Sequence, residues 1–210
     1  MKPEALARTV ALSSILLAGQ TAIASNAATA PSPNKPTVSA NGARDFDFLM
    51  GHWHVDNRRL PKALSGSDEW ETFAATQHAQ KLPADIGNFD DFVPQGWRPG
   101  FVGMSLRVFN PTTGLWSIYW LNNGDGGIDA ATGALTPPVV GKFQDGVGVF
   151  EANDDYKGQA IRVRYTWSHI TANSARWEQA FSPDGGATWE VNWVMQLTRK
   201  RAGPRIMPPL

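Results

Sequence analysis

Hydrophobic and polar residues alternate with a period of two along most of the chain after residue 44, and helical periodicity is nearly absent. The clearest runs are 116–121, 161–168 and 189–198. Because successive side chains of a strand point to opposite faces, each run predicts an antiparallel strand with one buried and one wet face. One helical turn is expected before the first strand, with Asp45 as N-cap and Gly51 as its stop.

Turn signals separate these runs. Residues 110–114, 144–146 and 182–186 combine Asn, Asp, Pro and Gly as tight reversals do. About eight to ten strands result, joined without long crossovers, and the connection 122–138 is expected to be a rim loop. Most of the nine Trp fall on predicted buried faces, where they can fill or line a lumen. We predict an all-β fold, a closed or nearly closed antiparallel up-and-down barrel with a short N-terminal helical turn.

The N-terminus has the pattern of a secretory signal peptide. A weakly basic start precedes a short apolar run at 10–19, and Ala22-Ile23-Ala24 fits a small-x-small cleavage site, with Ala28-Thr29-Ala30 as a second candidate. The run is too short to span a bilayer, and an uncleaved anchor is the alternative. The expected location is the periplasm or the cell exterior. The predicted divisions are a signal peptide at 1–24, a disordered linker at 25–43, the barrel at 44–201 and an extended tail at 202–210.

Composition narrows the function classes. The 19 basic and 19 acidic residues balance, which gives no electrostatic reason to expect nucleic acid as a partner or membrane insertion after signal cleavage. The chain has no Cys, so disulfides, thiolate catalysis and Cys-ligated metals are excluded. His52 and His54 share one strand face, but a metal site needs further ligands. We therefore expect surface histidines, no metal and no cofactor.

Several segments resemble one known family. They are 45–53 (DFDFLMGHW), 110–120, 137–150 and 174–198. They are similar to a bacterial family of uncharacterised function with a calycin-like barrel, related to lipocalins. In lipocalins a Gly-x-Trp step packs under a late Arg, which implies here that Trp53, after Gly51, packs under Arg199. Haem-binding relatives extend this step with further Gly residues, whereas this chain continues His54-Val55-Asp56, so the resemblance does not extend to haem.

The inward faces predict a ligand site for a small apolar or aromatic molecule. Arg59 lies on the face of Trp53, and a buried Arg needs an acceptor, which Glu69, Glu71, a loop carbonyl or a ligand carboxylate would supply. A structural role is favoured for Trp53, and Tyr165 could instead pair with another polar group in a packed core. The candidate ligand-binding residues are Trp53, Asn57, Arg59, Trp120, Tyr165, Gln179 and Trp193.

Three functions are compatible with this pattern. The leading interpretation is an exported barrel with an aromatic-lined lumen that binds a small molecule. The alternative is an isomerase or lyase, with His78, Arg59 and Tyr165 as proton-transfer and anchoring groups, because the alternation of 70–78 places His78 in the lumen. The Asp90 carboxylate could serve acid/base work, but the formation of a turn is favoured for it. The third is an interaction domain with a filled core, and the sequence leaves the ligand's identity and the oligomeric state open.

Overall fold

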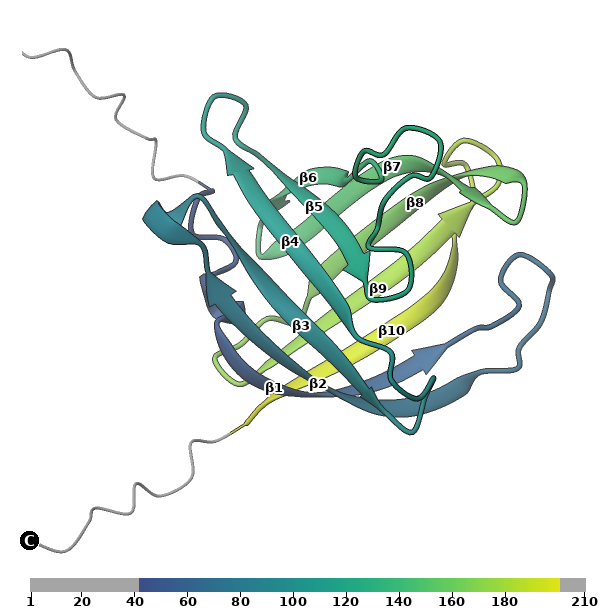
Figure 1. Cartoon of the computed structure of the whole chain (residues 1–210), viewed down its shortest axis with the longest axis horizontal. Helices are drawn as coiled ribbons and strands as arrows, with labels where there is room; N and C mark the ends of the chain where they lie inside the picture. Colours follow the sequence, from purple (N-terminus) through teal and green to yellow (C-terminus); the bar gives the residue numbers. More distant parts are fainter. Residues whose placement is uncertain (1–41, 201–210) are drawn as a thin grey trace, which may run out of the picture. The chain divides into compact units, whose positions relative to one another are not determined.

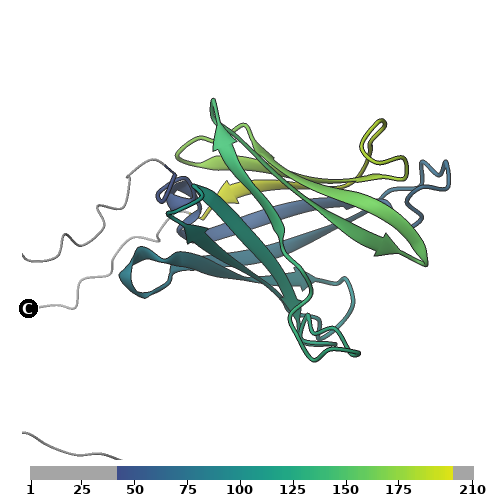
Figure 2. The ribbon, with the colours of Figure 1, turned by 90° about the horizontal axis from the view of Figure 1, so that it is seen from above.

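The computed structural model describes residues 42–200, which form a barrel of ten antiparallel strands (Figure 1, Figure 2). The strands are β1 (Gly51–Arg59), β2 (Glu71–Lys81), β3 (Gly87–Gln95), β4 (Gly103–Asn110), β5 (Leu115–Asn122), β6 (Val139–Gln144), β7 (Val147–Tyr156), β8 (Gln159–Ser168), β9 (Ser174–Ser182) and β10 (Glu190–Arg199). The helical elements of this part are two 3-10 turns, η1 (Asp47–Leu49) and η2 (Pro83–Asp85). The predicted closed, all-β, up-and-down fold is confirmed.

The barrel closes because the first strand pairs with the last. The strand β1 lies antiparallel to β10, with a register that runs from Trp53↔Arg199 to Arg59↔Trp193. Every other strand pairs with the strands before and after it in sequence. Closure gives every strand two hydrogen-bonded neighbours. One face of each strand therefore turns toward a common interior.

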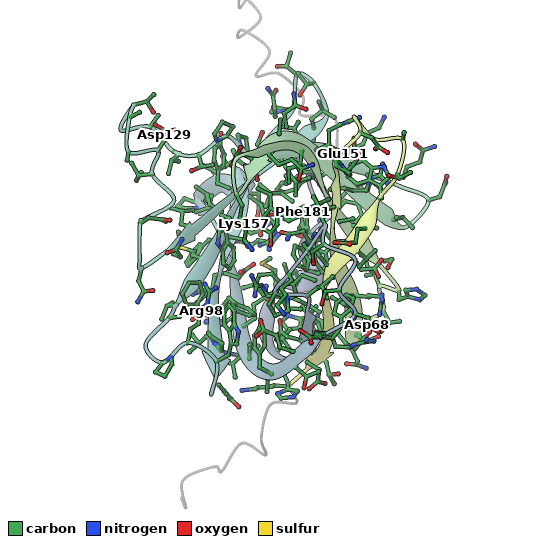
Figure 3. All side chains as sticks on the ribbon, turned by 90° about the vertical axis from the view of Figure 1, so that its right-hand side faces the viewer. Asp68, Arg98, Asp129, Glu151, Lys157 and Phe181 are labelled. Carbon is green, nitrogen blue, oxygen red and sulfur yellow. The ribbon has the colours of Figure 1, made fainter. Side chains whose placement is uncertain are left out.

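The seam between β5 and β6 is the shortest in the barrel. Three residue pairs join these strands, from Trp116↔Gly141 to Ile118↔Val139, whereas eight join β4 and β5. The connection 123–138 follows β5, and Asp129 on it lies at the edge of the barrel in Figure 3. The rim position predicted for this connection is thus confirmed, and the last residues of β5 pair with β4 alone.

Aromatic side chains fill the base of the barrel, where the chain enters β1. Phe46 is fully buried, with ring centroids 4.9 Å from Trp116, 5.0 Å from Phe143 and 5.7 Å from Phe150. The indole of Trp116 also donates a hydrogen bond of 2.9 Å to the backbone oxygen of Gly42. The entering segment therefore closes the base by inserting its own side chain among rings from three strands.

The packing of Trp53 under Arg199, implied by the resemblance, is present. The Arg199 guanidinium carbon lies 4.1 Å from the Trp53 ring centroid, and its nitrogens donate to the backbone oxygens of Phe48, Met50 and Ala172. Trp53 donates its indole N–H to Leu49 at 2.6 Å. One cation thus joins the last strand to the segment before the first and stabilises the closure of the barrel.

The predicted helical turn exists, but Asp45 does not cap it. Phe46 occupies the N-cap position without a side-chain hydrogen bond. This 3-10 turn instead pairs its own backbone, with Leu49 N–H donating to Phe46 at 3.0 Å and Met50 N–H to Asp47 at 3.3 Å. A turn this short leaves few free donors for a cap to satisfy.

The expected signal peptide, most of the expected linker and the expected tail lie outside the described residues. Across residues 42–200, no helix is long and apolar enough to cross a membrane.

Candidate functional site

A cavity of about 90 Å³ lies inside the barrel. Figure 3 looks at one end of the barrel, where Asp68, Arg98 and Lys157 mark the connections after β1, β3 and β7. Seven strands contribute side chains to the cavity, which is lined by Gln77, Asp90, Phe92, Ser105, Arg107, Ile118, Trp120, Tyr165, Trp167, Trp177, Gln179, Trp193 and Met195.

A buried ion pair lies among these lining residues. Arg107 and Asp90 are 2% and 1% exposed, and Nη1 of Arg107 donates to the Asp90 carboxylate and, at 3.1 Å, to Oδ1 of Asn88. Burial raises the pKa of Asp90, while the Arg107 guanidinium, the Gln77 amide and the Ser105 backbone N–H oppose that rise. A carboxylate and a guanidinium are thereby fixed in a largely aromatic interior.

The expectation that Asp90 forms a turn is wrong, and sequence reasoning missed Arg107. Asp90 lies within β3, on the same face as Asn88 and Phe92, while Arg107 shares the inward face of β4 with Phe109. The alternation itself carries this signal, because a polar residue two positions from a buried aromatic faces the same side. A buried Asp on one strand and a buried Arg on the next then indicate a pair.

Aromatic rings form the walls of the cavity. The Trp177 ring centroid lies 4.9 Å from Tyr165 and 6.0 Å from Trp193, and Phe92 lies 6.2 Å from Trp120. Burial raises the pKa of the Tyr165 phenol, and the nearby Asp154 carboxylate adds to the rise. The phenol therefore stays neutral at physiological pH and can donate or accept a hydrogen bond.

A cluster on β1, β2 and the connection after β3 packs above Trp193. Arg59 donates to Glu71 at 2.8 Å, and the Trp97 indole N–H donates to the same carboxylate at 3.1 Å. Trp97 also stacks on Phe73, with ring centroids 4.4 Å apart. Of the acceptors considered for Arg59, the structure thus selects Glu71. The cluster covers the cavity from the side of these strands, since Trp97 lies 6.0 Å from Trp193.

A second cavity, of about 180 Å³, adjoins the first beside the short β5–β6 seam. The two cavities share Ile118, Trp120 and Tyr165 as lining residues. Asp125 and Asp154 are among the polar residues of this side cavity.

The predicted ligand-binding residues fall in four places, and their roles stay predictions. Trp120, Tyr165, Gln179 and Trp193 line the cavity. Asn57 is buried beside it and accepts a hydrogen bond of 3.0 Å from the Trp193 indole. Arg59 lies in the covering cluster, and Trp53 lies at the base with Arg199, in the structural position favoured from sequence.

The placement of His78 in the lumen is wrong. The inward residues of β2 include Ala75, Gln77 and Ala79, and the His78 ring stacks instead on His52 of β1, with centroids 3.8 Å apart. The error arises because Ala residues occur on both faces of β2, so hydrophobicity does not identify the buried face. The proton-transfer group of His78, Arg59 and Tyr165 is not brought together. Residues 42–200 also hold no group of three His, Asp or Glu placed to bind a metal.

Comparison with known proteins assigns no family to the chain. No family model matches it, and no curated protein matches it. Among solved structures, it is similar to the S-type phycobiliprotein lyase CPES from Guillardia theta, with a TM-score of 0.47 and 9% identity over 75% of this chain and 92% of that chain. The resemblance to an uncharacterised calycin-like family therefore remains an expectation from the sequence.

Proposed function

We propose that this protein is exported and binds a small apolar or aromatic molecule in the lumen of its barrel. The observation that carries the proposal is the cavity of about 90 Å³ walled by Trp, Tyr and Phe rings. Its apolar walls and few polar groups are typical of small-molecule sites. A cavity of this kind also argues against a core filled entirely by side chains, which the interaction-domain interpretation requires.

The enzyme interpretation receives less support from the same cavity. Asp90 and Tyr165 are its acidic lining residues, and the carboxylate of Asp90 is held by Arg107. A general base must reach the proton that it removes. His78, the base expected from the sequence, lies on the outer face of β2.

A matched pair of Ser→Leu variants tests binding in the lumen. Ser105 lines the cavity, whereas Ser117 alternates with the buried Trp116 and Ile118 and so faces outward. With ethylbenzene as the probe, we expect the full chain to gain thermal stability, since a ligand that binds the folded state stabilises it. Ser105→Leu should abolish this gain, and Ser117→Leu should keep it. An equal response of both variants would contradict binding in the lumen.

Export is tested by fractionation of a bacterium that expresses the full chain. We expect the protein outside the cytoplasm, with a mature N-terminus at Ser25 or, for the second cleavage site, at Pro31. Intact-mass measurement identifies the N-terminus directly. A cytoplasmic protein that keeps Met1 to Ala24 would exclude the export part of the proposal and leave the binding part standing.

A further inference from the structure

We infer that the lumen ligand is an uncharged, single-ring molecule whose acceptor oxygen binds the guanidinium of Arg107. This inference rests on the proposed function and specifies the chemical class of its ligand. It follows from four observations. They are unpaired hydrogen-bond donors in the cavity, an Arg107 charge that Asp90 already balances, the small volume of the cavity, and the side cavity next to it.

The first property is the incomplete hydrogen bonding of Arg107. A guanidinium carries five N–H donors. Both hydrogen bonds that it makes with described residues come from Nη1, to Asn88 and Asp90, and Nε has no acceptor among residues 42–200. Since Arg107 is only 2% exposed, bulk water does not compensate. A buried donor without a partner costs free energy, which an acceptor bound beside it recovers.

A second unpaired donor belongs to another residue that lines the cavity. The indole Nε1 of Trp167 is buried and has no acceptor within the described part of the chain, and Trp167 also lines the cavity. The Arg107 guanidinium carbon lies 5.8 Å from the Trp167 ring centroid. Two unpaired donors on lining residues of one cavity thus favour a ligand with an acceptor.

The second property is that the charge of Arg107 is already balanced. Asp90 forms a buried ion pair with it. A ligand carboxylate would leave the buried group with a net negative charge, and a ligand ammonium would place a second cation beside the guanidinium. Either arrangement carries a large desolvation penalty. A neutral carbonyl, ester, amide or nitro oxygen accepts the hydrogen bond without that penalty.

The remaining two properties are the volume of the cavity and the presence of the side cavity beside it. About 90 Å³ is less than the roughly 150 Å³ of an apolar cavity known to hold benzene. One aromatic ring is therefore the upper limit, and its entry must displace wall side chains slightly. The side cavity shares Ile118 and Trp120 with the first cavity, which makes it the adjacent space for a short substituent.

Titration calorimetry of the full chain with four probes tests the ligand class. The probes are ethylbenzene, acetophenone, benzoate and benzylamine. We expect acetophenone to bind about tenfold or more tightly than ethylbenzene, which is the weaker end of the range for a hydrogen bond to a charged group. Acetophenone should also bind more tightly than either ion. Equal binding of acetophenone and ethylbenzene, or tighter binding of an ion, would overturn the inference and leave the proposed function intact. If none of the four binds, the proposed small-aromatic function itself fails.

A double variant assigns the preference to Arg107. Arg107→Met alone would leave Asp90 buried without its cation, so Asp90→Asn accompanies it and keeps an uncharged group at that position. We expect the preference for acetophenone over ethylbenzene to fall to near one in the double variant. A preference that persists in the folded variant would contradict the role of Arg107.

Infrared spectroscopy gives a readout that needs no variant. A carbonyl that accepts a hydrogen bond from a guanidinium absorbs at lower frequency than a free carbonyl. Bound, ¹³C-labelled acetophenone should show this shift relative to the same ketone in hexane. An unshifted band would overturn the inference even if the double variant does not fold.

Discussion

Both halves of the barrel interior contain Trp side chains, but these pack solidly in one half and enclose a cavity in the other. Trp116 and Trp120 lie on one strand, four residues apart. Trp116 packs against Phe46 in the filled base, whereas Trp120 lines the cavity. The difference arises because the entering segment inserts Phe46 into the base, whereas Trp97 of the connection after β3 packs over the other half and does not line the cavity. Aromatic content alone therefore does not distinguish a core from a binding site.

The ion pair of Asp90 and Arg107 lies where the filled base meets the cavity. Arg107 contacts both halves, since its guanidinium carbon lies 5.2 Å from the Phe46 ring of the base and the residue also lines the cavity. A buried ion pair rarely adds stability over an apolar pair of equal volume. Its position beside a cavity is consistent with the proposed role of Arg107 in ligand recognition.

The largest predicted effect compares a ring of the base with a ring of the covering cluster. Phe46→Ala should lower the free energy of unfolding by about 3–5 kcal/mol, because it removes a fully buried ring at the centre of the aromatic base. Phe73→Ala should cost less, about 1–2 kcal/mol, since Phe73 is only partly buried. Urea unfolding of both variants measures the difference. Equal costs would mean that the two halves are packed equally well.

A smaller change in the free energy of unfolding is expected for Arg199, at the base of the barrel, and for Arg59, in the covering cluster. Arg199→Ala should cost about 2–4 kcal/mol, because it removes the contact with Trp53 and three hydrogen bonds to backbone oxygens. Arg59→Ala should cost about 1 kcal/mol or less, since its partner Glu71 is one-third exposed. Thermal unfolding of the two variants provides the comparison. A larger loss for Arg59 would show that the covering cluster, not the base, holds the barrel closed.

The smallest effect concerns the turn between β9 and β10. Hydrogen bonds from Thr188 and Ser182 lower the pKa of Asp184 from 3.8 to about 2. Because the folded pKa lies below the unfolded one, this carboxylate contributes stability above pH 3.8 that is lost as the pH falls toward 2. Asp184→Asn should remove this contribution to the pH dependence of the unfolding free energy, and Thr188→Val should remove a smaller part of it. Unfolding free energies measured between pH 5 and 2 test this, and identical slopes for parent and Asp184→Asn would refute it.

Much of the fold could be predicted because alternation and turn chemistry are local. The runs 116–121 and 161–168 identified strands with the correct inward faces, and Trp120 and Tyr165 were placed in the lumen accordingly. The prediction failed for His78, since Ala residues on both faces of β2 give no hydrophobic contrast. It failed for Asp90 because Asp is common in turns, and the local sequence does not show that Arg107 lies opposite.

The sequence by itself determined a strand meander of the right size and the inward position of most indoles, since both depend on period-two alternation. The contact of Trp53 with Arg199 was implied by the resemblance to lipocalins. Only the tertiary structure decided which indoles pack against one another and which enclose space. It also decided that Asp90 and Arg107 meet in the interior. Burial of a charge is acceptable only with a partner nearby, and which residues become neighbours depends on the register of β3 against β4, which no single strand encodes.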